Sequence, residues 1–260
     1  MMKYLLNLLL LLSAIKGYSQ SGNFEKRTFT DKEGHILPYR ILFPENYDAS
    51  KKYPIVLVLH GAGERGNDNE KQLTHGSKLF LSPENRQKFP AIVIFPQCPT
   101  DSYWASVKID RSKSPLDIDF TYNEQPNWPL AAAIDLVKQI SKTEKVDKKR
   151  IYIMGLSMGG MGTFEAIARN PKLFAAAAPI CGGANLTWVK KYAKTVPVWI
   201  FHGDADGVVK VGYSRDMYAA LRALEAKEVK YTEYPNVNHN SWDNAFAEPN
   251  LLPWLFEHKK

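Results

Sequence analysis

The chain alternates between short apolar runs and longer segments of mixed polarity. The apolar runs are rich in β-branched or small residues and are predicted as strands centred on Val56, Ile92, Ile151, Ala176, Val198 and Val229. Helical stretches are predicted between them, near residues 70–81, 129–142, 162–168, 186–193, 213–225 and 251–258. Strands that alternate with helices predict an α/β fold, with a mostly parallel twisted sheet and helices on both of its faces.

Two segments depart from this alternation. Residues 24–30 and 36–43 flank the turn signal Asp31-Lys32-Glu33-Gly34, which predicts an N-terminal antiparallel hairpin at the sheet edge. Residues 98–127 are rich in aromatic side chains but show no clean periodicity. Because long loops inside a compact domain usually carry function, these aromatics either line a pocket or cover the sheet edge.

Residues 1–19 differ in composition from the rest of the chain. Lys3 precedes an apolar stretch, and Gly17 and Ser19 are small residues at the minus-three and minus-one positions of a cleavage site. The stretch is shorter than the roughly 20 residues needed to span a bilayer. We therefore expect a signal peptide cleaved before Gln20, no stable membrane anchor, and a secreted or periplasmic protein.

The chain has 260 residues and a formal net charge of +7, which falls to +5 without Lys3 and Lys16. This modest excess is compatible with an acidic polymer as partner, although an evenly solvated basic surface is the favoured explanation. No block of lysines and arginines interleaved with aromatics occurs. We therefore expect no nucleic-acid partner, and the oligomeric state stays open.

A G-x-S-x-G segment, Gly155-Leu156-Ser157-Met158-Gly159, stands between a predicted strand and an Ala-rich helical stretch. Its glycines allow a sharp turn, since a side chain at either flank would collide with the neighbouring elements. The turn exposes the Ser157 hydroxyl near the N-terminus of the helix, whose unpaired N–H groups favour developing negative charge. Ser157 is therefore the candidate nucleophile.

A nucleophilic serine requires a base and an acid that orients the base. Asp204 and Asp206 follow the next-to-last predicted strand, and His239 follows the last one. The order Ser157, Asp206, His239 is that of an α/β-hydrolase triad, with each member just beyond a strand. Because such strand ends share one edge of a parallel sheet, we expect the three side chains to meet, with Asp204 as the alternative acid.

The first strand of the predicted parallel sheet ends in the glycine-rich turn His60-Gly61-Ala62-Gly63-Glu64-Arg65-Gly66. In an acyl-transfer site such a turn aims backbone N–H groups at the oxyanion, and the N–H of Met158 supplies a second donor. We assign the first donor of this oxyanion hole to Ala62, with Gly63 as the alternative.

Four further residues lie near these motifs. His60 and His202 end strands and are less favoured than His239 as the base. Glu64 and Arg65 are expected to pair with each other beneath the oxyanion turn.

Two other interpretations of the motifs fail. Gly61, Gly63 and Gly66 match a dinucleotide fingerprint, but neither an apolar helix start nor an acidic strand end follows at the required distance. Asp204 and Asp206 resemble part of a calcium loop that lacks its remaining ligands. The sequence thus supports neither nucleotide binding nor a metal site.

The segments LHGAGERG, GLSMGG, HGDADGVV and NHNSW resemble those of a secreted esterase group. This group contains polyhydroxybutyrate depolymerases, feruloyl esterases, acetyl xylan esterases and bacterial "predicted peptidase" relatives. The likeness extends from about Phe24 to the C-terminus. It implies a single α/β-hydrolase domain over residues 20–260 and a Ser-His-Asp carboxylic-ester hydrolase without a cofactor. It also implies that His60 and His202 serve packing and backbone hydrogen bonds. It leaves the substrate open, because this fold supports many chemistries.

Within the group, feruloyl or acetyl esters of plant cell-wall polysaccharides are the leading expectation for the ester substrate. A lipase-like or polyester esterase and a peptidase are the alternatives, and a non-catalytic secreted binding module is the alternative of another class. Tyr103, Trp104 and Trp242 are the candidate substrate contacts, although Trp242 also suits packing against the loop of His239.

The two cysteines follow strands that the usual hydrolase order separates by two other strands. Three steps of ~4.8 Å place these strands roughly 14 Å apart. A disulfide requires Cα atoms within about 7 Å. Cys98 and Cys181 are therefore predicted to be unpaired thiols, unless the loops that carry them fold back toward each other.

Overall fold

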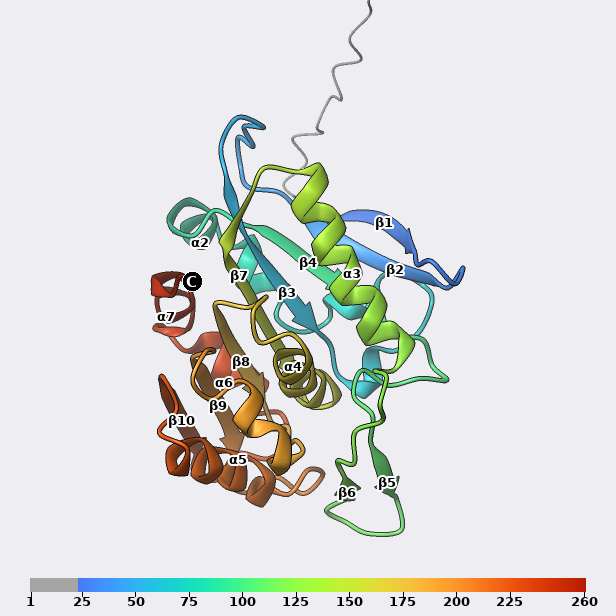
Figure 1. Cartoon of the computed structure of the whole chain (residues 1–260), viewed down its shortest axis with the longest axis vertical. Coiled ribbons are helices and arrows are strands. Elements are labelled where there is room, and N and C mark those ends of the chain that lie inside the picture. The colour runs from blue at the N-terminus through green and yellow to red at the C-terminus, as the bar shows by residue number, and fades with distance from the viewer. Residues whose placement is uncertain (1–22) are drawn as a thin grey trace, which may run out of the picture.

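The computed structural model describes residues 23–260 (Figure 1), so the predicted signal peptide lies outside the described residues. Within residues 23–260, none of the helices combines the length and the apolar character needed to cross a membrane.

The described residues form an eight-stranded sheet in the order β1-β2-β4-β3-β7-β8-β9-β10. Its strands are β1 (Glu25–Thr30), β2 (Ile36–Leu42), β3 (Tyr53–Leu59), β4 (Ile92–Pro96), β7 (Val146–Leu156), β8 (Ala176–Ile180), β9 (Val198–Gly203) and β10 (Val229–Tyr234). The strands from β4 to β10 in this order run parallel, and β1 and β2 form an antiparallel hairpin at one edge. The predicted mostly parallel sheet with its edge hairpin is thereby confirmed.

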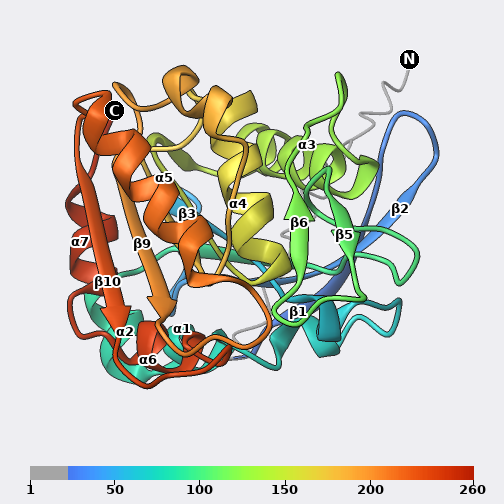
Figure 2. The same ribbon diagram turned by 90° about the horizontal axis from the view of Figure 1, so that it is seen from below.

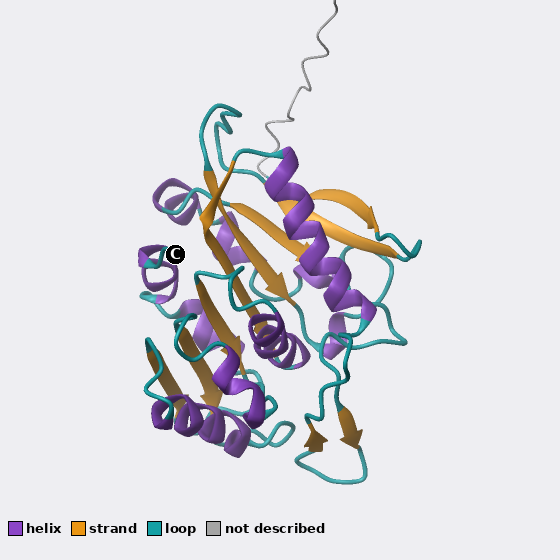
Figure 3. Ribbon diagram, in the orientation of Figure 1, coloured by secondary structure: helices purple, strands orange, loops and turns teal. Residues whose placement is uncertain are grey.

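Helices cover both faces of the sheet (Figure 3). One face carries α3 (Trp128–Thr143), α4 (Met158–Arg169), α5 (Val211–Ala223) and the 3₁₀ helix η3 (Leu186–Lys191). The other carries α1 (Ser77–Leu81), α2 (Pro83–Lys88), α6 (Trp242–Ala247) and α7 (Leu251–Glu257). Alternate side chains of each strand therefore enter two separate apolar cores, which explains why the central strands β3, β4 and β8 are buried along their whole length.

Some predicted helices differ in detail. The stretch predicted near residues 70–81 divides into the 3₁₀ turn η2 (Lys71–Leu73) and α1, because Gly76 adopts φ 80° between them. A Cβ atom at Gly76 would lie 2.8 Å from the ring of Phe246, so this break also seats α6. The periodicity predicted neither α2 nor α6, which are too short to show a helical repeat.

The irregular segment 98–127 contains a small antiparallel hairpin, β5 (Lys108–Asp110) with β6 (Asp117–Asp119). The hairpin projects beyond the carboxyl ends of the parallel strands (Figure 1) and lies beside α4 when the molecule is seen from below (Figure 2). It therefore stands next to the sheet edge that collects the sequence motifs.

Candidate active site

Ser157 lies in a tight turn between β7 and α4. Its backbone has φ 53° and ψ −115°, a strained conformation for a non-glycine residue, and its N–H donates to the carbonyl of Ile180 at 2.9 Å. The flanking glycines are required by close approach. A Cβ atom at Gly155 would lie 2.4 Å from the carbonyl oxygen of Gly159, and one at Gly159 would lie 2.0 Å from that of Leu59.

The structure brings Ser157, His239 and Asp206 together from three separate loops. The Ser157 Oγ lies 3.0 Å from Nε2 of His239, and Nδ1 of His239 lies 2.8 Å from Oδ2 of Asp206. A proton on Nδ1 is donated to the carboxylate, which leaves Nε2 free to accept the hydroxyl proton. Asp204 points elsewhere and caps the backbone N–H of Asn236 at 2.6 Å.

The carboxylate of Asp206 is buried and surrounded by donors. Its Oδ1 accepts the backbone N–H groups of Val208 at 2.8 Å and Val209 at 2.9 Å. Burial alone would raise the pKa of Asp206, but the hydrogen bonds from His202 and His239 outweigh it and hold the pKa well below its usual range. Asp206 therefore carries a negative charge at neutral pH.

His202 has the expected packing and backbone hydrogen-bond role and, in addition, contacts Asp206. Its ring is completely buried, and Nε2 lies 3.0 Å from the same Oδ2 of Asp206 that faces His239. It also lies 3.1 Å from the carbonyl of Val209. The sequence motifs did not predict this contact with the carboxylate, although the position of His202 near the end of strand β9, four residues before Asp206, was a usable signal.

The predicted oxyanion turn forms the short 3₁₀ helix η1 (Ala62–Glu64). The N–H groups of Ala62 and Gly63 at the start of η1, like that of Met158 at the start of α4, have no acceptor within their own helix. His60 fixes the turn: its Nε2 accepts the N–H of Cys98 at 2.9 Å, and its Nδ1 lies 2.6 Å from the carbonyl of Gly61. Burial lowers the pKa of His60 to about 4, so this imidazole is neutral.

Arg65 does not pair with Glu64 as expected. Its guanidinium donates to the carbonyls of Ala62, Thr100 and Ser102 at 3.0, 2.9 and 3.2 Å. The cation thus ties the oxyanion turn to the segment after β4. The carboxylate of Glu64 instead faces His75, with 3.7 Å between Oε1 and Nε2.

A cavity of about 300 Å³ opens above Ser157. Its walls are largely apolar and include a few polar groups. They comprise residues 61–64, Tyr103, Ile109, Arg111, Leu116, Ile118, residues 156–158, Met161, Val208, Val209, His239 and Trp242. The hairpin β5–β6 thus supplies one wall and the loop of Asp206 another. An apolar cavity with convergent polar groups is typical of a small-molecule site.

The three predicted substrate contacts fall in different places. Tyr103 and Trp242 line the cavity, and the ring of Trp242 packs edge-on against His239 with 5.2 Å between centroids. Trp104 is completely buried, and its Nε1 donates to the carbonyl of His60 at 3.1 Å. Trp104 is therefore corrected from a substrate contact to a core residue beneath the oxyanion turn.

The hairpin wall is held by a buried ion pair on α4. The carboxylate of Glu165 is fully buried and accepts the N–H of Ser106 at 2.7 Å. Arg169 pairs with Glu165 at 2.7 Å and donates to the carbonyls of Glu124 and Asn123 at 2.9 and 2.6 Å. The Glu165–Arg169 pair therefore anchors both stems of the hairpin, before β5 and after β6.

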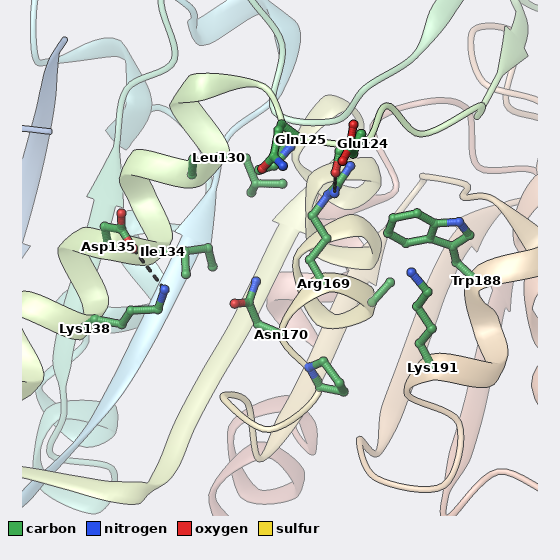
Figure 4. A pocket seen from close by; sticks show the side chains of 14 residues that line it. Glu124, Gln125, Leu130, Ile134, Asp135, Lys138, Arg169, Asn170, Trp188 and Lys191 are labelled. Carbon is green, nitrogen blue, oxygen red and sulfur yellow. Dashed lines mark hydrogen bonds and ion pairs between the residues drawn. The ribbon is translucent and has the colours of Figure 1, made fainter. Parts of the chain in front are cut away.

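A second cavity, of about 660 Å³, lies at the other end of α4 (Figure 4). Its cations are engaged by neighbouring groups: Lys138 pairs with Asp135 at 3.0 Å, and Lys191 Nζ lies 3.1 Å from the centre of the Trp188 ring. Arg169, also visible there, is the hairpin anchor. No candidate nucleophile with an adjacent base lines this cavity.

Among the described residues, two groups of side chains have the spacing of metal ligands. The first is Cys181 with Asp206 and His239, but burial raises the pKa of the Cys181 thiol well above its usual range, so no thiolate is available. The second is Glu228 with Glu257 and His258, where Glu228 already accepts from Trp254 Nε1 at 2.7 Å and faces His258 Nε2 at 3.0 Å. Both cysteines are unpaired, as predicted.

Known families and proteins that are similar to this chain include esterases. A family described as "Putative esterase" matches residues 34–247. A bifunctional acetylxylan esterase/xylanase from Neocallimastix patriciarum is 29% identical over 187 residues, which cover 70% of this chain and 24% of that protein. An acyl-protein thioesterase 1 from Mycosarcoma maydis is 30% identical over 151 residues, covering 48% of this chain and 60% of that protein. The chain thus spans about a quarter of the first relative.

Two solved structures of esterases have the same fold as this chain. The crystal structure of a thermostable esterase superposes with a TM-score of 0.82 at 37% identity, covering 92% of this chain and 64% of that one. A ferulic acid esterase superposes with a TM-score of 0.68 at 16% identity, covering 90% of this chain and 98% of that one. The fold is that of the α/β-hydrolases.

Proposed function

Because the chain belongs to the Esterase family, we propose that it hydrolyses carboxylic esters through an acyl-enzyme on Ser157. The observation that carries this proposal is the continuous hydrogen-bonded series from Ser157 Oγ through His239 to Asp206 at the floor of an apolar cavity. A hydroxyl, an imidazole and a buried carboxylate in this order provide a nucleophile, a base and a group that orients the base.

In the first half of the cycle, His239 Nε2 takes the proton of Ser157 as Oγ bonds to the ester carbonyl carbon. Asp206 stabilises the imidazolium that forms. The proton then passes to the leaving alcohol as the ester C–O bond breaks. In the second half, His239 activates a water that attacks the acyl-enzyme, and the acid and Ser157 are released.

The oxyanion of each tetrahedral intermediate requires donors that are already in place. We assign these donors to the N–H groups of Met158 and Ala62, with Gly63 as the alternative to Ala62. Hydrogen bonds hold both segments in place: His60 and Arg65 bind carbonyls of the turn at η1, and the Ser157 N–H binds the carbonyl of Ile180. Preorganised donors of this kind are worth about 3–4 kcal/mol each in related chemistry.

The cavity favours a bulky, apolar acyl group. Ile109, Leu116, Ile118 and Met161 contribute apolar surface that an acetyl group would leave uncovered. We therefore place a feruloyl-type ester of a plant cell-wall polysaccharide before an acetyl ester, with Tyr103 and Trp242 as contacts for the substrate. The acetylxylan and ferulic acid esterases among the related proteins support this substrate class.

Plant cell-wall polysaccharides lie outside the cell that would produce this protein. The signal peptide expected at residues 1–19 would deliver the protein there, and the mature chain from Gln20 is proposed to be secreted or periplasmic. The proposal requires no cofactor and no metal, because the acyl transfer uses only protein groups.

The test is covalent labelling by a fluorophosphonate combined with Ser157→Ala. We expect the wild type to be labelled and the variant to lose labelling, with turnover of ester substrates lower by at least about three orders of magnitude. Circular dichroism should show the same fold in both. Near-normal rates in the variant would end the assignment, and an unlabelled, inactive wild type would favour the non-catalytic binding module.

The substrate class is tested on a panel. It comprises methyl ferulate, acetylated xylan, para-nitrophenyl esters of increasing acyl length and aminoacyl-naphthylamides. We expect the highest kcat/KM for the hydroxycinnamoyl ester. Preference for long aliphatic esters or for the naphthylamides would replace the substrate assignment by a lipase-like or peptidase activity.

A further inference from the structure

His202 places a second imidazole against the carboxylate of Asp206. Oδ2 of Asp206 lies 2.8 Å from Nδ1 of His239 and 3.0 Å from Nε2 of His202. The His202 ring is completely buried at the end of β9, whereas His239 lies at the cavity. The reaction proposed above uses only His239 and assigns no task to His202.

The hydrogen-bond partners of His202 determine where one of its protons lies. Nε2 faces two acceptors, the Asp206 carboxylate and the carbonyl of Val209 at 3.1 Å, so it must carry a proton. Nδ1 lies 2.7 Å from the hydroxyl of Ser214, which in turn lies 3.0 Å from the carbonyl of Gly182. Whichever way the Ser214 proton points, His202 donates through Nε2.

We propose that His202 is a positioning residue that donates a permanent hydrogen bond to Asp206 and thereby sets the strength of the Asp206–His239 interaction. This inference rests on the proposed function. Two donors on one carboxylate oxygen share its electron density, so each bond is weaker than it would be alone. The buried donor also fixes the plane of the carboxylate, because Ser214 on α5 and Val209 hold the ring from either side.

The other groups that face this pair have fixed states. Glu233 is the register partner of His202 on β10 and is bound by Arg215 from α5 at 2.7 and 2.9 Å. The Cys181 thiol on the remaining side is neutral, because burial raises its pKa. Asp206 and His239 are thus the groups whose protonation His202 influences directly.

The decisive variants are His202→Phe, which keeps the ring volume but removes the donor, and His202→Gln, which keeps a side-chain N–H. Without the His202 bond, Asp206 becomes a better acceptor and stabilises the charged form of His239. Because His239 must be neutral to accept the Ser157 proton, the acid limb of the kcat/KM profile should move to higher pH in His202→Phe by roughly half a unit to one unit. His202→Gln should restore most of the wild-type profile.

Ser214→Ala is the second variant if His202→Phe fails to fold. It frees Nδ1 and should move the acid limb in the same direction by a smaller amount. His258→Gln is the matched control, since His258 is also held by a carboxylate, Glu228, away from the cavity, and its profile should equal that of the wild type. A folded His202→Phe enzyme, or Ser214→Ala in its place, with an unchanged acid limb would overturn the proposal.

A spectroscopic readout separates this inference from the proposed function. Nitrogen-15 NMR of the resting protein should show a solvent-protected imidazole N–H that is lost in His202→Gln and shifted in Asp206→Asn. If the wild type hydrolyses no ester, the proposed function fails while this signal still tests the hydrogen bond. If the signal is absent, His202 does not donate to Asp206 and the inference fails, whatever the activity.

Discussion

Helix α4 begins beside Ser157 at a cavity of about 300 Å³ and ends with Arg169 at a cavity of about 660 Å³. Its 12 residues separate the two by roughly 18 Å. At the first cavity, polar groups from separate loops converge on one hydroxyl. At the second, the cations are already bound to Asp135, to the Trp188 ring or to backbone carbonyls.

The convergence of polar groups, rather than the volume of the cavity, is therefore our reason for proposing the smaller cavity as the reaction site. The larger cavity has a more polar lining, but no candidate nucleophile with an adjacent base lies in it. The two ends are nevertheless connected, because Arg169 at the larger cavity holds the hairpin that walls the smaller one through Glu165. Variants along α4 and at its two ends therefore test whether the two cavities act independently of each other.

The largest effect is expected for Asp206→Asn. The amide cannot stabilise the imidazolium of His239 and favours the wrong tautomer, so kcat/KM should fall by about three to four orders of magnitude. Asp204→Asn is the matched control two residues earlier, and it should change kcat/KM less than about threefold. Steady-state kinetics on one ester measures both, and equal losses would show that the acid was misassigned.

Arg169→Met tests the connection between the two ends. The substitution leaves the buried Glu165 carboxylate without its cation, which should cost about 3–5 kcal/mol in the free energy of unfolding. Chemical denaturation measures this loss. The loosened hairpin should also lower kcat/KM for a hydroxycinnamoyl ester more than for an acetate ester.

The double variant Glu165→Gln with Arg169→Met separates charge burial from anchoring. Removal of both charges should recover most of the stability, because a neutral amide oxygen can still accept from Ser106 N–H. The hairpin stems at residues 123–124 stay unanchored, so the selective loss on the bulky ester should persist. If activity recovers together with stability, the pair contributes stability alone.

The sequence predicted the three residues around Ser157 far better than the segment that forms a wall of the same cavity. Ser157, Asp206 and His239 each follow a strand, and strand ends of a parallel sheet are brought to one edge by the fold itself. No such rule applied to residues 98–127, whose shape depends on Glu165 and Arg169 far along the chain. Trp104 was therefore misplaced, since nothing local distinguishes a buried tryptophan from one that lines a cavity.

His202 is a second residue whose position, but not its contact, could be predicted from the sequence. Its place at the end of β9 was predicted, but its contact with Asp206 depends on the loop of residues 204–209 turning back toward the strand. That turn is held by the N–H groups of Val208 and Val209 on the carboxylate. Local pattern predicts the residue and the element, whereas the contact follows only from the assembled loop.

Protonation of His60 at low pH should lower the free energy of unfolding, because this buried imidazole supports the oxyanion turn near the start of α4. Its pKa is about 4 in the folded protein, below the ordinary value of 6.5, because burial disfavours the charged form. The unfolded chain therefore binds this proton first as the pH falls. The contribution of neutral His60 to the free energy of unfolding is therefore fully present above about pH 6.5. Roughly 3 kcal/mol of it is lost as the pH falls toward 4.

Denaturant unfolding of the wild type and His60→Gln from pH 7 to pH 4 measures this contribution. The two stabilities should converge as the pH falls, because the variant lacks the titrating group. Parallel curves would show that His60 is not buried in its neutral form, and the support of the oxyanion turn would need another explanation.

The smallest effect is expected at the larger cavity, for Trp188→Ala. The ring contacts Lys191 and Arg169 and packs against Tyr122, none of which is proposed to touch the substrate. Loss of a half-buried ring should lower the free energy of unfolding by about 1–2 kcal/mol and change kcat/KM less than about twofold.

Trp242→Ala is the counterpart at the smaller cavity and removes the ring that packs against His239, so kcat/KM should fall about tenfold. Equal losses in the two variants would mean that the larger cavity takes part in the reaction and that convergence of polar groups does not distinguish the two ends of α4.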